Sequence, residues 1–196
     1  MARLREFDTD IALAKAMDVF WKCGYEDATL PDLLEGMNLS RGSLYKAFKD
    51  KKALFLIVLC NYDEQAVSDA VSLLTNTDQD GWDRIFSLFD SITDLVESGD
   101  RRGCLLCSAI AGPAAYDPDI AALAFKSIDR MAKAFEQAIE ASAVPNDAAS
   151  VAQLLVTQYV GLRMVSRTNI PATKIKQTAQ ALRRFATPSN GPPQEW

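Results

Sequence analysis

Apolar residues recur at helical spacing in almost every segment of the chain. Residues 10–24, DIALAKAMDVFWKCG, place Ile11, Ala14, Met17 and Phe20 on one face, and Gly24 predicts the end of that helix. No segment shows the alternation of a half-buried strand, and no internal repeat is found. The pattern therefore predicts an all-α fold.

Two short helices joined by a turn are predicted between residues 29 and 48. The first, TLPDLLEGM, begins with Thr29 at the N-cap position and carries Asp32 at capping-box spacing. Asn38 stands where the chain must turn, and asparagine tolerates left-handed backbone better than most residues. Ser40 is the predicted N-cap of the second helix, RGSLYKAF. The arrangement predicts a helix-turn-helix.

Longer helical segments follow this pair. One is predicted over residues 51–74, and the remaining candidates are residues 80–98, 103–116 (interrupted by Gly112–Pro113), 117–142, 146–168 and 172–186. The pattern predicts an N-terminal three-helix domain at residues 1–50 and a larger helical domain at residues 51–187. Residues 188–196 are rich in proline and polar residues and are predicted to be a disordered tail.

Charge is distributed unevenly along the 196 residues. The whole chain has a net charge of −5, yet its first 60 residues hold nine of the 21 basic and nine of the 26 acidic side chains. The basic residues of this part concentrate after Asn38, which indicates an anionic partner for the front of the chain only. Neither a membrane-spanning run nor a signal peptide is recognisable, so a cytoplasmic protein with no membrane partner is expected.

The second helix of the predicted pair has side chains suited to a DNA major groove. Leu44 and Phe48 lie four residues apart and face inward, leaving other residues outside. Arginine and lysine can bind guanine edges, and serine and tyrosine can bind phosphate oxygens. The predicted DNA-binding residues are Thr29, Ser40, Arg41, Gly42, Ser43, Tyr45, Lys46 and Lys51. The plainer alternative is a surface helical hairpin with a solvated charge run.

Residues 8–60 resemble the DNA-binding domain of the TetR family of transcriptional regulators. The family pattern of Gly, Thr or Ser, Leu or Ile, Tyr, then Phe, Lys and Leu is met by Gly42, Ser43, Leu44, Tyr45, Phe48, Lys51 and Leu54. Asn38 stands where the family commonly has glycine, and Lys46 and Ala47 replace frequent aromatic or histidine residues. These departures leave the operator sequence open.

The resemblance implies a dimeric repressor that binds a palindromic double-stranded DNA operator. It also implies a helical C-terminal domain that binds a small apolar effector, whose identity is open, and forms the homodimer. Candidate pocket residues are Trp82, Phe86, Phe89, Tyr116, Phe125, Met131, Tyr159 and Met164. Candidate dimer residues are Leu154, Leu155, Gln158, Gly161, Leu162, Val165, Ile175 and Leu182. For each aromatic, plain core packing is the alternative.

The run CLLC gives a second hypothesis, a repressor that senses electrophiles or oxidants through Cys104. Arg101, Arg102 and a helix N-terminus next to Cys104 would favour its thiolate, with Cys107 as a resolving thiol. The alternative is that both cysteines are small buried hydrophobes. No metal site or cofactor is expected, since the chain has no histidine and no second CxxC. The absence of a nucleophile–base pair also makes an enzyme or carrier a remote alternative.

Overall fold

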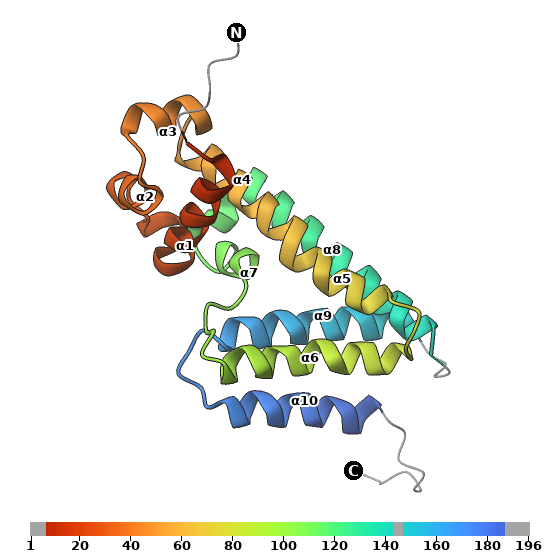
Figure 1. Ribbon diagram of the computed structural model, residues 1–196. Coiled ribbons are helices and arrows are strands. Elements are labelled where there is room, and N and C mark those ends of the chain that lie inside the picture. Colours follow the sequence, from red (N-terminus) through yellow and green to blue (C-terminus); the bar gives the residue numbers. More distant parts are fainter. Residues whose placement is uncertain (1–6, 143–146, 187–196) are drawn as a thin grey trace, which may run out of the picture. The chain divides into compact units, whose positions relative to one another are not determined.

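The computed structural model describes residues 7–142 and 147–186. Every regular element in these two ranges is helical, so the predicted all-α fold is confirmed (Figure 1). The predicted tail, residues 188–196, lies outside the described residues. None of the described helices is both long and apolar enough to cross a membrane.

The chain packs as two compact units. Unit 1 contains residues 1–69 and 102–131, and unit 2 contains residues 70–101 and 132–196. The sequence predicted a functional boundary near residue 50 instead, and that division into a DNA-binding and an effector-binding domain stays a prediction.

Unit 1 is organised around α1 (Thr9–Asp27), which packs against α2 (Leu30–Met37), α4 (Lys51–Tyr62) and α7 (Leu105–Ala109). Helix α3 (Arg41–Phe48) packs against α4. The unit also contains a 3₁₀ turn, η2 (Pro113–Tyr116), and the first part of α8 (Pro118–Glu140). Its largest fully buried side chains are Phe20, Leu33, Leu44, Leu54, Phe55, Leu59 and Leu105.

The predicted capping signals of the helix-turn-helix are confirmed. The Thr29 hydroxyl oxygen accepts a hydrogen bond from the Asp32 N–H at 3.3 Å, and the Asp32 carboxylate accepts one from the Thr29 N–H at 2.9 Å. Asn38 has left-handed backbone, with φ 54° and ψ 48°. The Ser40 hydroxyl oxygen accepts a hydrogen bond from the Ser43 N–H at 3.2 Å. Local chemistry therefore determines where α2 ends and α3 begins.

Two helix boundaries differ from the sequence prediction. Gly24, predicted as the end of the first helix, is a kink with φ 82°, after which the helix continues to Asp27. The helix predicted over residues 51–74 is interrupted by a π-turn, η1 (Asp63–Val67), before α5 (Ser68–Thr75). A guanidinium from α8 holds this turn, because Arg130 donates to the Asp63 carboxylate at 2.5 Å and to the Ser68 hydroxyl at 3.1 Å. That contact spans more than 60 residues of sequence, so no local pattern could reveal it.

In unit 2, α6 (Gly81–Glu97) packs against α9 (Ala148–Val165) and α10 (Ala172–Ala186) (Figure 1). Buried Ile85, Phe89 and Ile92 line the inner face of α6. The ring of Phe89 lies 6.2 Å from both the Phe135 and the Tyr159 rings. Aromatic contacts at this spacing stabilise beyond area burial alone and hold the helices in register.

Candidate nucleic-acid interface

Helix α3 presents a basic outer face over an apolar inner one. Leu44 is fully buried and Phe48 is 4% exposed, while Arg41, Tyr45 and Lys46 are exposed. The Arg41 guanidinium carbon lies 5.8 Å from the centre of the Tyr45 ring, so two predicted DNA-binding side chains are neighbours. Helix α3 carries no acidic residue that would oppose a phosphate backbone.

The smaller predicted residues lie at the N-termini of α2 and α3. The Thr29 hydroxyl donates to the Asp32 carboxylate at 2.5 Å, which lowers the pKa of that carboxyl. Ser40 and Ser43 are joined through their hydroxyl oxygens at 2.9 Å. A side chain on exposed Gly42 would meet only the Ser40 hydroxyl, at 4.0 Å. Packing within the protein therefore gives no reason for a glycine there.

Lys51 does not simply extend into solvent as a phosphate ligand. Its ammonium donates to the Glu26 carbonyl at 3.0 Å and lies 4.8 Å from the centre of the Tyr25 ring. Contact with phosphate, which sequence reasoning favoured, stays a prediction. The link between α3 and α4 also contains a tight turn that the sequence did not indicate. Lys49 has φ 70° and ψ −62°, and the Asp50 N–H donates to the Phe48 carbonyl at 2.8 Å.

The aromatic residues assigned to one effector pocket occupy separate places. Tyr116 and Phe125 are 90% and 72% exposed, so the prediction that they line an apolar pocket is wrong. Phe125 falls beside the buried stripe of α8, which runs through Ile120, Ala124 and Met131. The others belong to unit 2 except Met131, which is buried in unit 1.

Within unit 2 the remaining pocket candidates form two aromatic groups. Trp82 and Phe86 stack at 5.7 Å, and the Arg183 guanidinium lies 4.5 Å from the Phe86 ring centre. Phe89 and Tyr159 belong instead to the cluster with Phe135. Met164 is half-buried on α9.

Both cysteines of the CLLC run are buried, and the two preceding arginines contact other parts of the protein. Cys104 is the N-cap of α7, as expected from its place, but it is 7% exposed, and Cys107 is 4% exposed. Arg101 donates to the carbonyls of Thr168 and Ile170, both at 2.9 Å. Arg102 lies 3.5 Å from the Asp18 carboxylate and over the Trp21 ring. The burial of both side chains agrees with the alternative that they are small buried hydrophobes, and sensing through Cys104 stays a hypothesis.

A shallow groove of about 600 Å³ is lined by residues of α9, of α10 and of the segment between them. Five of the predicted dimer residues line it, namely Gln158, Gly161, Leu162 and Val165 of α9 and Ile175 of α10. Leu154 is 68% exposed on α9, and Leu182 is half-buried on α10. Leu155 is 1% exposed, so its assignment to an outer face is wrong; it packs the core of its own unit.

Comparison with known proteins agrees with this arrangement. Residues 12–58 match the model of the family described as bacterial regulatory proteins, tetR family. The HTH-type transcriptional repressor ComR of Escherichia coli K12 is 32% identical over 105 residues, which are 53% of this chain and 50% of that protein. YezE, an uncharacterised HTH-type transcriptional regulator of Bacillus subtilis 168, is 29% identical over 139 residues, 70% of this chain and 69% of its own.

Solved structures extend the similarity over both units. The TetR family transcriptional regulator CifR, a cysteine mutant in complex with 26-bp double-strand operator DNA, has a TM-score of 0.80 and 28% identity. The match covers 94% of this chain and 100% of that one. The reduced form of Escherichia coli NemR shares the fold, with a TM-score of 0.79, 19% identity and coverage of 93% and 100%.

The helix-turn-helix with its basic outer face defines a DNA-binding transcriptional regulator. Residues 12–58 carry the tetR-family DNA-binding domain, and over most of its length the chain is similar to TetR-family transcriptional regulators.

Gly42→Ala should raise the stability of the protein and lower its affinity for the operator. We expect the free energy of unfolding to rise by about 0.5–1 kcal/mol, because alanine favours helix and meets no close atom in the protein. Operator affinity should fall, because a methyl group at this position holds the helix backbone away from DNA. Urea denaturation and fluorescence anisotropy on promoter DNA measure the two effects. Unchanged affinity in a stabilised variant would show that DNA does not approach Gly42.

Proposed function

We propose that this regulator is a homodimeric repressor that places α3 of each protomer in successive major grooves of a palindromic operator. The proposal is supported by the exposed Arg41 and Lys46 on a helix whose inner face is fixed by Leu44 and Phe48. Two recognition helices related by a two-fold axis require half-sites about one helical turn apart. The repressor role is favoured by the similarity to ComR, which is named a repressor.

The groove on α9 and α10 is the surface that we assign to the dimer. Its lining is mainly apolar, through Leu162, Val165, Ile170 and Ile175, and Leu154 adds an exposed leucine on the same helix pair. Gly161 has no atom within 4 Å of an added Cβ, so a second helix can approach it closely. Four helices, two from each protomer, would bury this apolar surface.

Release by a small apolar effector remains part of the proposal on the strength of the family resemblance alone. The aromatic side chains assigned to the effector pocket form separate contacts, and we name no particular effector molecule. We propose no catalytic reaction for this chain. Its site of action would be the cytoplasm, where promoter DNA is accessible.

Gly161→Glu should convert the dimer into a monomer. The glutamate fits the isolated protomer, where no atom lies near the position, but it brings two unpaired carboxylates together between protomers. Sedimentation at micromolar concentration should give the dimer mass for the wild type and the monomer mass for the variant. Gln153→Glu, at an exposed position of α9 outside the groove lining, is the matched control and should remain dimeric. A wild type that sediments as a monomer contradicts the proposal.

Repression itself is tested with a reporter fused to the promoter of the protein's own gene. Reporter expression should rise when the gene is deleted and fall again when the wild type is supplied. Reporter expression that falls on deletion would identify an activator instead.

A further inference from the structure

The segment between α7 and α8 is attached to α1 and to α4, the helix that directly follows α3. The Glu26 carboxylate, near the end of α1, accepts a hydrogen bond from the Ala114 N–H at 2.5 Å. This contact joins residues 88 apart in sequence and satisfies a backbone donor at the start of η2. The backbone carbonyl of the same Glu26 accepts a hydrogen bond from the Lys51 ammonium.

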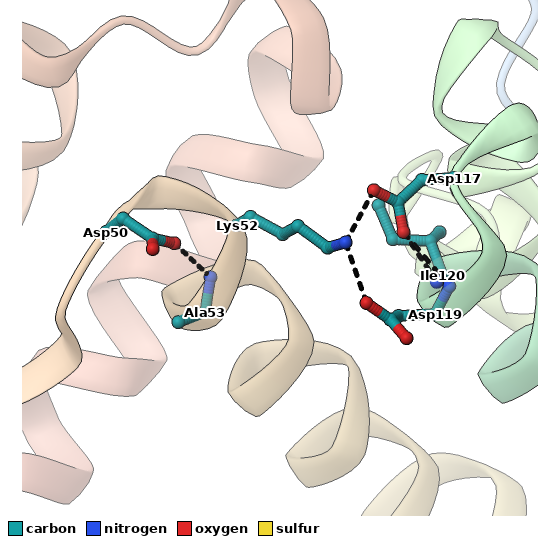
Figure 2. Close-up of polar contacts among 6 residues, drawn as sticks. All are labelled: Asp50, Lys52, Ala53, Asp117, Asp119 and Ile120. Atoms are coloured by element: carbon teal, nitrogen blue, oxygen red, sulfur yellow. Dashed lines mark hydrogen bonds and ion pairs between the residues drawn. The ribbon is translucent and has the colours of Figure 1, made fainter.

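A second attachment, which we call the α4 clasp, consists of Lys52, Asp117 and Asp119. The Lys52 nitrogen lies 2.7 Å from a carboxylate oxygen of Asp117 and 2.7 Å from one of Asp119 (Figure 2). Asp117 is oriented independently, because its other oxygen accepts the N–H groups of Asp119 and Ile120 at 3.0 and 3.3 Å. Hydrogen bonding to Lys52 lowers the pKa of Asp117, and the pKa of Lys52 is raised, so both charges persist at neutral pH.

The clasp fixes the first turn of the helix that follows the recognition helix. Only Lys49 and Asp50 separate α3 from α4, and Asp50 caps α4 by accepting the Ala53 N–H at 2.8 Å (Figure 2). Because the link is only two residues long and forms a tight turn, the orientation of α4 constrains the orientation of α3. With Lys51 bound at Glu26 and Lys52 bound at the clasp, both basic residues at the start of α4 are directed onto the protein.

We propose that Asp117 and Asp119 are positioning residues for operator recognition, which hold α4, and through it α3, at the orientation that base contacts require. The inference rests on the proposed DNA-binding role of α3. Simple electrostatics gives the opposite expectation, because two carboxylates close to a DNA-binding helix repel phosphates. A partly exposed ion pair also contributes little to stability by itself. The clasp can fix the orientation of α4 and α3, which the charge of the two aspartates alone cannot do.

The test is a double variant, Asp117→Asn with Asp119→Asn, measured on two duplexes. Asparagine keeps the capping acceptor at the start of α8 while removing the ion pair with Lys52. Affinity for the duplex of the protein's own promoter should fall by about tenfold, because the orientation of α3 is no longer fixed. Affinity for an unrelated duplex of equal length should rise or stay constant, because phosphate attraction needs charge and not orientation. The ratio of the two affinities is therefore the measured quantity.

An affinity ratio that does not fall in the double aspartate variant overturns the proposal. If affinity for both duplexes rises together, the two aspartates act only by repulsion, and if neither affinity changes, the clasp has no part in recognition. Glu64→Gln with Asp69→Asn removes two exposed carboxylates from the same unit without touching Lys52, and it should leave the ratio unchanged. A wild type that shows no preference for its own promoter refutes the proposed function itself, so the two failures are distinguishable.

Variants of Lys52 separate positioning from a general loss of structure. Lys52→Met should lower the affinity ratio as far as the double aspartate variant does, and combining the two should add nothing, because one contact is lost in each case. Lys52→Arg should retain the ratio, since a guanidinium can bind both carboxylates. A ratio that falls equally in Lys52→Arg and Lys52→Met, or effects that add fully, would contradict a clasp. Thermal unfolding of each variant confirms that the comparison is made between folded proteins.

Discussion

Arg41→Ala should nearly abolish selective operator binding. An arginine that forms two hydrogen bonds with a guanine edge contributes about 1–3 kcal/mol of discrimination. The proposed homodimer presents Arg41 twice, so the loss for a whole operator should be about 2–6 kcal/mol if the half-sites act independently. The Arg41 side chain is exposed at the first residue of α3 and lies next to the Tyr45 ring, which is the structural basis of this expectation.

The measurement is fluorescence anisotropy on the promoter duplex and on duplexes with single base-pair changes. Arg41→Ala should lose discrimination at one position of each half-site, and Lys46→Ala at another if Lys46 also reads a base edge. Lys126→Ala removes one exposed positive charge from α8 and is the control for net charge. A uniform loss of affinity across all duplexes would place Arg41 on phosphates and would contradict its role in base recognition.

Gly81→Ala should cause the largest loss of stability of any glycine substitution considered. A Cβ at this position would lie 1.6 Å from the carbonyl oxygen of Ala138, so the start of α6 and the end of α8 must move apart. Overpacking of this kind costs about 1–3 kcal/mol, and more where the obstructing atom belongs to backbone. We expect the free energy of unfolding to fall by about 3 kcal/mol or more.

Urea denaturation at one fixed protein concentration measures this change. Gly42→Ala is the matched control, because it adds the same methyl group to a helix in open space and should stabilise. A small effect of Gly81→Ala would show that α6 and α8 can separate at little cost, which contradicts their close packing in unit 2.

The parts of the fold that the sequence predicted correctly depend on local interactions. The Thr29–Asp32 capping box, the left-handed Asn38 and the Ser40 cap each involve residues within three positions of one another. Such interactions follow from residue type and spacing, so the boundaries of α2 and α3 and the inward direction of Leu44 could be read from the chain.

The features that escaped prediction depend on contacts far apart in sequence. Lys52 meets Asp117 and Asp119 across more than 60 residues, and the π-turn at Asp63 is held by Arg130 over a similar span. The same limitation applies to the hypothesis about Cys104. Proximity in sequence suggested that Arg101 and Arg102 act on the thiol, whereas tertiary packing buries it and gives both arginines other contacts.

The central claim is that α3 recognises a specific palindromic operator. A footprint of the wild-type protein on its own promoter, at near-physiological salt and with an unrelated duplex as competitor, tests this most directly. The account predicts a protected palindrome whose half-sites are centred about one helical turn, roughly 10 base pairs, apart. It also predicts that the Arg41→Ala variant leaves this region unprotected at the same concentration. Protection that is equal along the whole promoter, or unchanged in Arg41→Ala, would contradict the claim.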